Sequence, residues 1–407
     1  MDEFDHRSLG ARLRLYHFEE DAPGMPFWHP RGHALYRALE DLVRGRMRAH
    51  GFAEVRTPQL LPRALWERSG HWGKFRANMF AVEDSERPMA LKPMSCPCHV
   101  ALFGRHLRSW RELPLRYAEF GACHRNEPSG AMHGLMRTRA FVQDDAHVFC
   151  RPDDVAGEVA RFFALLRGIY DVLGFGAVSV ALSTRPAERF GDDAAWDAAE
   201  TALLDAARAC GHEPAIQAGE GAFYGPKLEF ALRDRLGRSW QCGTVQLDYV
   251  LPGRLGAAYV GPDSARAVPV MIHHAVLGSM ERMIGILLEH HAGDLPLRIA
   301  PDQVALMPLS REQDDYAGQV ATALADAGIR VLPMPADESL SRRIVEARAL
   351  MVPLHAVVGR REAAARSAML TLRDGSRAEV ALADLPARVA ALAAADAGAG
   401  APPAAAA

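Results

Sequence analysis

The chain has 407 residues, of which 49% are hydrophobic and 24% charged, and it carries a formal net charge of −3 at pH 7. This length predicts two domains, because one hydrophobic core seldom serves so long a chain. The near-neutral charge gives no electrostatic signature of a nucleic-acid binder, although a local basic patch remains compatible with it. The charged start argues against a secretory signal, and no apolar run reaches the roughly 18 residues of a membrane helix, so a cytoplasmic protein is expected.

Cysteine and lysine usage narrows the chemistry further. The six cysteines form no compact framework, which favours cytosolic thiols or single metal ligands over disulfides. Lysine occurs only at positions 74, 92 and 227, so arginine supplies the other 44 of the 47 basic residues. Lys92 and Lys227 are therefore candidates for positions that require a compact ammonium group. The alternative is that these two lysines were retained by chance.

Residues 31–50 predict an amphipathic helix, because apolar residues recur at helical spacing and Gly51 follows. The apolar positions are Leu35, Leu39, Leu42, Val43 and Met47. A strand is expected next, over residues 52–58.

Residues 91–150 carry Arg, Glu, His, Cys and Gly at unusual density, with little of the periodicity of a packing segment. They predict two strands joined by a turn at 128–130. The charged side chains of this hairpin suit a polyanion, and a merely solvated charged hairpin is the alternative. These side chains are Arg116, Glu119, Arg125, Glu127, Arg137 and Arg139.

The remaining elements follow from the same patterns. Helices are expected over 155–173, 193–210 and 280–291, and strands over 223–232 and 239–247. The last helix opens with the segment GSMER, and a helix N-terminus is suited to an anion. From Gln303 a strand–helix–strand–helix–strand pattern predicts a small α/β domain.

The segment HRNEPSG at 124–130, with Phe141 on the strand that follows, resembles motif 2 of class II aminoacyl-tRNA synthetases. Other segments, from about Asp5 to about Ala300, are similar to threonyl-tRNA synthetases in particular. They are DHRSLG, LYHFEEDAPGMPFWHP, WERSGHW, LKPMSCPCH, FVQDDAHVFC, GEGAFYGPKLEF, WQCGTVQLD and VPVMIHHAVLGSMERMIGIL. A motif 2 match alone is moderate support, whereas the chained set is specific.

The resemblance implies an α/β architecture in three parts. Residues 1–299 would form a class II catalytic domain of α+β type, with an antiparallel sheet flanked by helices. Residues 300–392 would form a small α/β domain similar to anticodon-binding domains, and residues 393–407 a disordered tail rich in Ala and Pro. The helix–strand unit at 31–58 matches motif 1, which implies a homodimer; taken alone, the helix could equally belong to the core of one chain.

For ATP and its Mg²⁺, the resemblance implies contacts made mainly by arginine. Arg125 would contact the α-phosphate and the amino-acid carboxylate, Arg137 the γ-phosphate, and Arg282 the far side of ATP, because a guanidinium suits bidentate phosphate contacts. Glu127 would bind the adenine amino group, and Phe141 would stack on the base. Two further positions would serve as Mg²⁺ ligands or hold those ligands: Glu229 and Gln241.

For the amino acid, the resemblance implies a zinc ion held by Cys96, His147 and His273, with an open position for the threonine amine and hydroxyl. The spacing of these three residues by itself indicates no metal site. His71 would help to activate the terminal hydroxyl of tRNA. The pocket would be completed by Met94, Gln143, Asp145, Tyr224 and Gln246, with Cys242 in its wall.

Several positions depart from the family pattern. Cys98 replaces a glycine beside Cys96, either as a bystander thiol or as a further group at the metal, and His274 stands where an arginine is common. Residues 337–339 read Asp-Glu-Ser instead of Asn-Glu-Lys, which puts conventional anticodon binding in doubt. The amino-terminal editing domains of bacterial relatives are expected to be absent.

The leading hypothesis is ATP-dependent activation of L-threonine and its transfer to tRNA(Thr). One alternative keeps the activation but passes threonine to a carrier protein or another acceptor that is not tRNA. The other is a paralogue that binds tRNA without catalysis, against which the intact arginines argue.

Overall fold

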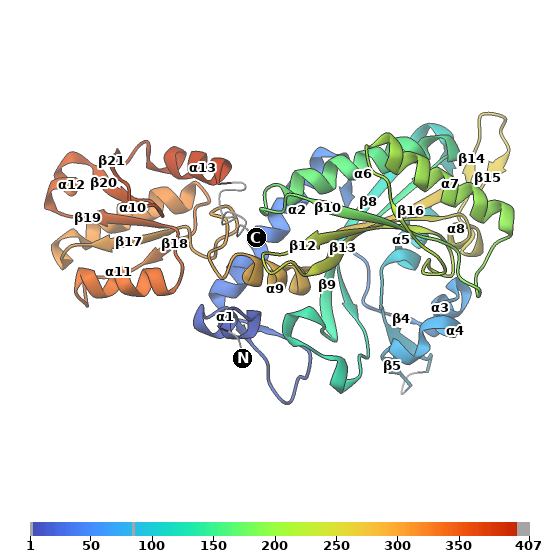
Figure 1. Ribbon diagram of the computed structural model, residues 1–407, viewed down its shortest axis with the longest axis horizontal. Coiled ribbons are helices and arrows are strands. Elements are labelled where there is room, and N and C mark those ends of the chain that lie inside the picture. The colour runs from blue at the N-terminus through green and yellow to red at the C-terminus, as the bar shows by residue number, and fades with distance from the viewer. Residues whose placement is uncertain (1–2, 84–85, 397–407) are drawn as a thin grey trace.

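The computed structural model describes residues 3–83 and 86–396, and it forms two lobes (Figure 1). The larger lobe is built on one eight-stranded sheet of order β11-β10-β12-β13-β16-β9-β8-β3. Its pairs are antiparallel except β10–β11 and β3–β8, which are parallel. In that order the strands span Ala215–Gln217, Val178–Ser183, Lys227–Arg233, Ser239–Asp248, Val270–Ser279, Ala140–Cys150, Leu115–His124 and Ala53–Glu54.

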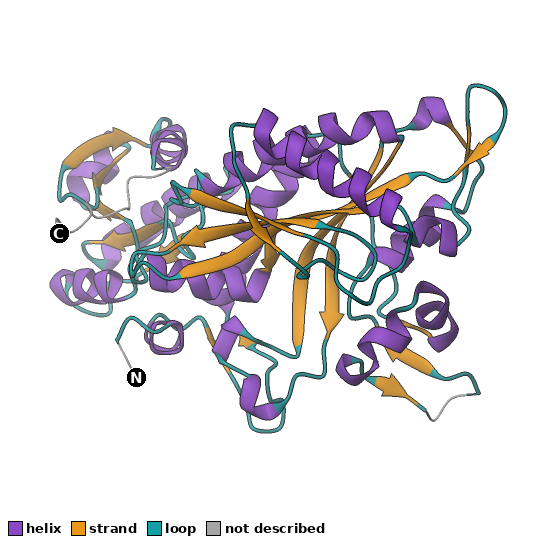
Figure 2. Cartoon of the chain, turned by 45° about the vertical axis from the view of Figure 1, so that its right-hand side comes forward, coloured by secondary structure: helices purple, strands orange, loops and turns teal. Residues whose placement is uncertain are grey.

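Three long helices cover one face of this sheet (Figures 1 and 2). They are α2 (Pro30–Ala49), α6 (Val155–Tyr170) and α7 (Asp193–Ala209). Because side chains alternate along a strand, Val245 and Leu247 of β13 join the core beneath these helices, whereas Thr244 and Gln246 face away from it. The opposite face of the sheet is thereby left for polar side chains.

Helix α9 (Met280–His290) follows β16 directly, and Ser279 caps it by accepting the N–H of Arg282 at 3.1 Å. Shorter elements surround the sheet and the hairpin β8–β9. The helices are α1 (His6–Arg12), α3 (Arg63–Ser69), α4 (His71–Phe75), α5 (Cys96–Phe103) and α8 (Leu251–Arg254), with a 3-10 turn η4 (Gly134–Met136). The strands are β1 (Tyr16–His17), β2 (Phe27–Trp28), β4 (Leu60–Pro62), β5 (Ala81–Val82), β6 (Met89–Leu91), β7 (Arg108–Ser109), β14 (Tyr259–Val260) and β15 (Arg266–Ala267).

Most predicted elements are confirmed in kind, with three corrections. The stretch 91–150, expected as two strands and a turn, contains helix α5 before the strands β8 and β9. Two boundaries are also wrong. The strand expected over 52–58 is reduced to the two residues of β3, beyond which Thr57 bonds to a side chain of β8. The strand expected from Phe223 begins only at Lys227. A turn precedes it, in which a Cβ on Gly225 would lie 1.6 Å from the carbonyl oxygen of Leu247.

The smaller lobe contains a five-stranded sheet of order β18-β17-β19-β20-β21, parallel at first and antiparallel from β20 onward. The strands are Val331–Pro333, Val304–Pro308, Leu354–Val358, Ser367–Thr371 and Arg377–Ala381. Helices α10 (Asp314–Asp326) and α13 (Leu385–Ala395) pack on one face, α11 (Leu340–Ala349) packs on the other, and α12 (Arg360–Ala365) precedes β20. The predicted strand–helix–strand–helix–strand unit is β17 to β19; the hairpin and α13 were not foreseen.

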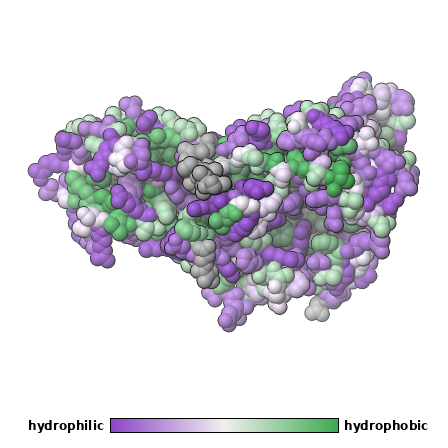
Figure 3. Space-filling view, viewed as in Figure 1, coloured by the Kyte–Doolittle hydropathy of each residue, from purple (hydrophilic) through white to green (hydrophobic). Residues whose placement is uncertain are grey.

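The disordered tail expected over 393–407 is corrected at its start, because α13 continues to Ala395. The remainder of that prediction, from 397 onward, lies outside the described residues. In the space-filling view hydrophilic side chains predominate on the visible face of both lobes (Figure 3). None of the helices in the described ranges is both long and apolar enough to cross a membrane.

Candidate active site

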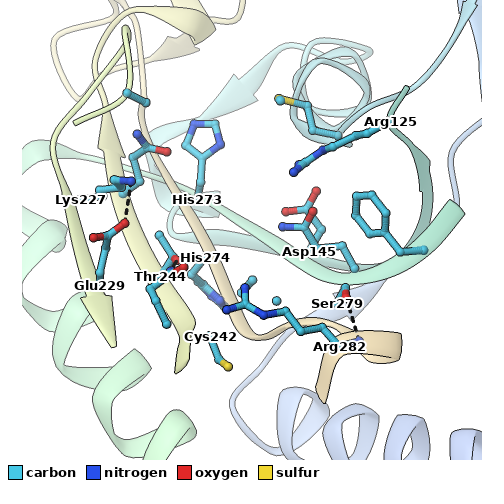
Figure 4. Close-up of a pocket in the computed structure, with 18 of the residues that line it drawn as sticks. Arg125, Asp145, Lys227, Glu229, Cys242, Thr244, His273, His274, Ser279 and Arg282 are labelled. Atoms are coloured by element: carbon cyan, nitrogen blue, oxygen red, sulfur yellow. Dashed lines mark hydrogen bonds and ion pairs between the residues drawn. The ribbon is translucent and has the colours of Figure 1, made fainter. Parts of the chain in front are cut away.

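The face of the large sheet opposite the long helices forms a cavity of about 690 Å³. Its floor comes from residues of β9, β12, β13 and β16, and the first turn of α9 closes one side (Figure 4). The cavity contains every binding, catalytic and metal-ligating residue predicted from the sequence except His71. These residues are Met94, Cys96, Arg125, Glu127, Arg137, Phe141, Gln143, Asp145, His147, Tyr224, Glu229, Gln241, Cys242, Gln246, His273 and Arg282.

Three arginines from separate elements enter this cavity. The Arg125 guanidinium lies 5.0 Å from the ring centroid of Phe141 and donates to the carbonyl oxygen of Pro93 at 3.3 Å. Arg137 is half exposed and donates through Nε to a Glu127 carboxylate oxygen at 2.9 Å. Arg282 occupies the first turn of α9, where the positive end of the helix dipole adds to its charge. The arrangement is suited to a ligand with several negative charges.

The Arg282 guanidinium lies 6.0 Å from the Trp240 ring centroid, a neighbour that the sequence did not indicate. On the opposite side of the cavity Lys227 pairs with Glu229 at 2.6 Å (Figure 4). The Gln241 amide donates to Thr244 Oγ1 at 2.8 Å. A carboxylate and an amide oxygen therefore line the wall, as a hard cation on a phosphate would need.

Cys96, His147 and His273 come together although 51 and 126 residues separate them along the chain. Their ligand atoms all lie within 4.8 Å of one another, and all three residues are buried. The Nε2 atom of His147 lies 3.1 Å from Nδ1 of His273. Burial lowers the pKa of His147, so the ring is neutral, which is the form that binds a metal.

A thiol and two imidazoles are a donor set that suits zinc. Asp248 supports this interpretation, because its Oδ2 accepts from Nε2 of His273 at 3.0 Å and leaves Nδ1 with its lone pair toward the cluster. Three protein ligands leave one coordination position open, as in zinc sites that bind substrate. The residues present therefore fit a zinc ion with an open side toward the cavity.

The side chains beside this cluster are positioned by the backbone. Asp145 accepts the N–H of Ser95 at 3.1 Å, and burial raises the pKa of its carboxyl. The Gln246 amide donates to the carbonyl oxygen of Gly225 at 2.9 Å. The ring of Tyr224 lies 5.1 Å from that of His273, between centroids. A small ligand at the cluster is thus surrounded by one carboxylate, one amide and one aromatic ring.

His71 is the exception among the predicted residues. It is fully buried and does not line the cavity. Its Nδ1 lies 2.8 Å from Ser69 Oγ, and its Nε2 lies 3.8 Å from Cys96 Sγ. Burial lowers the pKa of His71 to about 4, so it is a neutral neighbour of the thiol.

The two departures from the family pattern have separate surroundings. Cys98 does not belong to the three-residue cluster, and burial raises the pKa of its thiol. His274 points to the helix side of the sheet, where its ring packs on Phe52 and Phe162 at centroid distances of 5.0 and 4.9 Å. Neither side chain supplies a ligand to the cluster.

Sequence reasoning missed Asp248 and His99, both of which bond to the histidines of the cluster. Asp248 could have been found by alternation, because Thr244, Gln246 and Asp248 share one face of β13. His99 carries no comparable signal, since it reaches His147 from a helix.

Family models and solved structures agree with this geometry. Residues 80–291 match the model of the tRNA synthetase class II core domain (G, H, P, S and T), and residues 303–392 match an anticodon binding domain. The chain is similar to the threonine–tRNA ligases of Azoarcus sp. strain BH72, with 51% identity over 91% of this chain, and of Gluconacetobacter diazotrophicus, with 52% over 92%. It spans 58% and 59% of the length of these relatives.

The most informative structural likeness is to the RNA binding domain of threonyl-tRNA synthetase from Cryptosporidium parvum Iowa II. The TM-score is 0.92 with 39% identity, over 95% of this chain and 98% of that one. A threonyl-tRNA synthetase from Aeropyrum pernix, described as putative, gives 0.82 with 28% identity over 97% of both chains. Prolyl-tRNA synthetase from C. parvum, at 17% identity, shares the fold. Together with the cavity and its cysteine–histidine cluster, these likenesses show that the chain belongs to the threonyl-tRNA synthetase family of class II aminoacyl-tRNA synthetases.

Proposed function

We propose that this chain activates L-threonine with ATP and transfers it to tRNA(Thr). The observation that carries the proposal is one cavity in which Arg125 and Arg282 converge beside the Cys96–His147–His273 cluster. A polyanion and a small polar ligand can bind there side by side. The names of the relatives at 51% and 52% identity support the same activity.

In the proposed activation step, a threonine carboxylate oxygen attacks the α-phosphate of ATP, forms the new P–O bond and expels pyrophosphate. No covalent bond to the protein is required, so the chain acts by positioning and by charge stabilisation. Arg125 neutralises the α-phosphate and aligns the carboxylate, and Arg282 contacts ATP from its far side. Glu229 and Gln241 would hold the Mg²⁺ that accompanies ATP, and its charge would offset that of the departing phosphates.

The adenine would lie against the ring of Phe141. Glu127 would accept from its amino group, while Arg137 turns from Glu127 to the γ-phosphate. This exchange needs only a side-chain rotation, because Arg137 is half exposed.

The zinc ion, when bound by the cluster, supplies a Lewis-acid contact for the amine and the β-hydroxyl of threonine. Asp145 would accept from the substrate ammonium, and Gln143, Tyr224 and Gln246 would enclose the side chain. Met94 would limit its length. Valine has the shape of threonine without the hydroxyl, so it would leave the polar groups of this pocket unpaired.

The acceptor is inferred from the smaller lobe. The match of residues 303–392 to an anticodon binding domain supports tRNA over a carrier protein.

The proposal also includes a cytosolic location and a homodimer. The location follows from the use of the product in translation, and the homodimer from the resemblance to motif 1, which forms the interface in the family. The apolar face of α2 is not that interface, since Leu35, Leu39 and Val43 are buried in the core of this chain.

ATP–pyrophosphate exchange with each of the twenty amino acids tests the activation step. We expect threonine to support the fastest exchange without tRNA, and esterification of tRNA(Thr) to follow when tRNA is added. Exchange with threonine but no esterification would favour the alternative acceptor. Binding of tRNA without any exchange would show a paralogue that does not catalyse.

A further inference from the structure

A row of buried polar groups leads from the edge of the large sheet to the cysteine–histidine cluster. It starts at Lys92, whose side chain is fully buried. Lys92 Nζ donates to Thr57 Oγ1 at 2.8 Å and to Glu119 Oε1 at 3.0 Å. The N–H of Thr57 also donates to Glu119 Oε1, at 2.7 Å. One oxygen of the Glu119 carboxylate is therefore surrounded by donors.

The other oxygen of Glu119 continues the row. Oε2 lies 3.1 Å from Nε2 of His99, and Nδ1 of His99 lies 2.7 Å from Nδ1 of His147. Burial alone would raise the pKa of Glu119, but the bonds from His99 and from the Thr57 N–H, with the charge of Lys92, lower it to about 2. Glu119 is thus a carboxylate, which can only accept hydrogen bonds.

Because Glu119 can only accept, it determines which ring nitrogen carries the proton in each histidine along the row. His99 must carry its proton on Nε2 in order to donate to Glu119, so its Nδ1 is an acceptor. His147 must then carry its proton on Nδ1, which leaves the lone pair of Nε2 directed at the cluster. On the other side Asp248 imposes the corresponding choice on His273. Two lone pairs consequently face each other across 3.1 Å, an arrangement that a cation between them would stabilise.

We propose that Lys92, Glu119 and His99 are positioning residues that hold His147 in the tautomer that binds the metal. The proposal rests on the metal site proposed above and adds residues that do not touch the metal. It also accounts for Lys92 in a chain in which arginine supplies 44 of the 47 basic residues. A compact ammonium fits between Thr57 and Glu119 where a planar guanidinium does not.

The nearly isosteric substitution Glu119→Gln distinguishes this positioning role from a role in packing alone. In Glu119→Gln the amide oxygen stays at the Oε1 position, because Lys92 and Thr57 surround it with donors. The amide NH₂ then faces His99 Nε2 and makes that nitrogen accept. His99 in turn donates to His147 Nδ1, and the proton of His147 moves to Nε2, where the metal would bind.

Titration of the metal-stripped protein with Co²⁺, with affinity measured by competition against a chelator, gives a readout that is independent of activity. We expect Glu119→Gln to lower the Co²⁺ affinity about 10–100-fold. The matched control is Glu158→Gln, which removes a buried carboxylate from its pair with Arg116 at 2.6 Å. The control should lower stability and leave the Co²⁺ affinity at the wild-type value.

His99→Phe provides a second variant, in case the amide variant does not fold. The ring is retained, the acceptor for His147 is lost, and we again expect about 10–100-fold weaker Co²⁺ binding. In the double variant, Glu119→Gln should cause no further loss, because it acts only through His99. Wild-type affinity in either single variant, or additive losses in the double variant, would overturn the relay. A wild-type protein that binds no Co²⁺ would instead overturn the metal site itself.

Discussion

At the scale of single residues, the account depends on charge that is oriented before the substrates arrive. Arg125 is held between the ring of Phe141 and the carbonyl oxygen of Pro93. Its guanidinium is therefore already oriented toward the cavity and need not be reordered when the substrates bind. A flexible surface arginine would lack this property. Orientation, more than charge alone, distinguishes Arg125 from the many other arginines of the chain.

Arg125→Ala should therefore lower the rate of threonine-dependent pyrophosphate exchange by about 100–1,000-fold. Arg125→Lys should not restore it, because a point charge does not reproduce two parallel bonds. Arg105→Ala, at an exposed position of the same lobe, serves as the control and should keep the wild-type rate. Near-normal exchange in Arg125→Lys would show that charge alone is sufficient.

A pair of matched cysteine variants tests which of the two neighbouring thiols is the metal ligand. Cys96→Ala should abolish bound zinc, because it removes the only thiolate ligand of the described cluster. Cys98→Ala should retain about one zinc per chain, since that thiol is not part of the cluster. Metal analysis after dialysis distinguishes the two; zinc lost from Cys98→Ala and kept in Cys96→Ala would reverse the assignment.

The motifs were sufficient to predict which residues gather in the cavity, because each motif carries its own signature. They could not predict the bonds that orient those residues. The pairing of Glu127 with Arg137, and the position of His71 behind Cys96, depend on how separate segments meet in space. Whether His71 acts on tRNA stays a prediction.

At the scale of elements, helix α1 connects two segments that the site requires. His6 donates from Nδ1 to Glu289 of α9 at 2.6 Å and accepts the N–H of Leu135 in η4 at 3.1 Å. Gly134 allows this close approach, because it has a positive φ and a Cβ there would lie 2.1 Å from the His6 ring. Arg137 follows within the same loop, so α1 supports the loop that carries the arginine proposed to contact the γ-phosphate of ATP.

Glu289→Gln should lower stability at neutral pH by about 2 kcal/mol. Burial raises the pKa of Glu289, but bonds from His6 and Arg238 lower it further, to about 2 from its ordinary 4.5. A lowered folded-state pKa means that this contribution is complete above pH 4.5 and is lost as the pH falls toward 2. Urea denaturation of both proteins between pH 7 and pH 3.5 should show the difference shrinking, and a constant difference would contradict the assignment.

Long helices and the central hairpin were predictable because their periodicity or charge extends over many residues. The two-residue strand β3 and the late start of β12 were not, since both depend on contacts with distant segments. The hairpin β20–β21 was not predicted because its own local pattern is weak. Its strands are short, and Arg377–Ala381 is largely exposed, so its sequence shows little apolar alternation.

At the scale of the whole molecule, ion pairs and hydrogen bonds made by a few arginines join the two lobes. Arg31 of α2 pairs with Asp302 at 2.6 Å and donates to the carbonyl oxygen of Leu350 at 2.9 Å and to that of Leu13. Arg373 pairs with Asp294 at 3.1 Å from the smaller lobe. The boundary predicted at 299–300 stays a prediction, and it lies within the stretch 292–302 that neither family model matches.

Arg31→Ala should loosen this junction without disturbing the cavity. We expect pyrophosphate exchange to stay near the wild-type rate, while aminoacylation of tRNA falls about tenfold, because a misplaced lobe misaligns a bound tRNA. Arg14→Ala is the matched control, since its pair with Glu346 also joins the lobes but is largely exposed and contributes little. Equal losses of exchange and aminoacylation in Arg31→Ala would indicate general unfolding instead.

The central claim is that a metal-centred pocket selects threonine through its hydroxyl. The ratio of kcat/KM for threonine to that for valine, in ATP–pyrophosphate exchange by the zinc-loaded protein, tests it most directly. A pocket that must pair its polar groups with the substrate hydroxyl predicts a ratio of about 10,000 or more. A ratio of about 200 or less is what an apolar pocket achieves by shape alone, and that result would contradict the account.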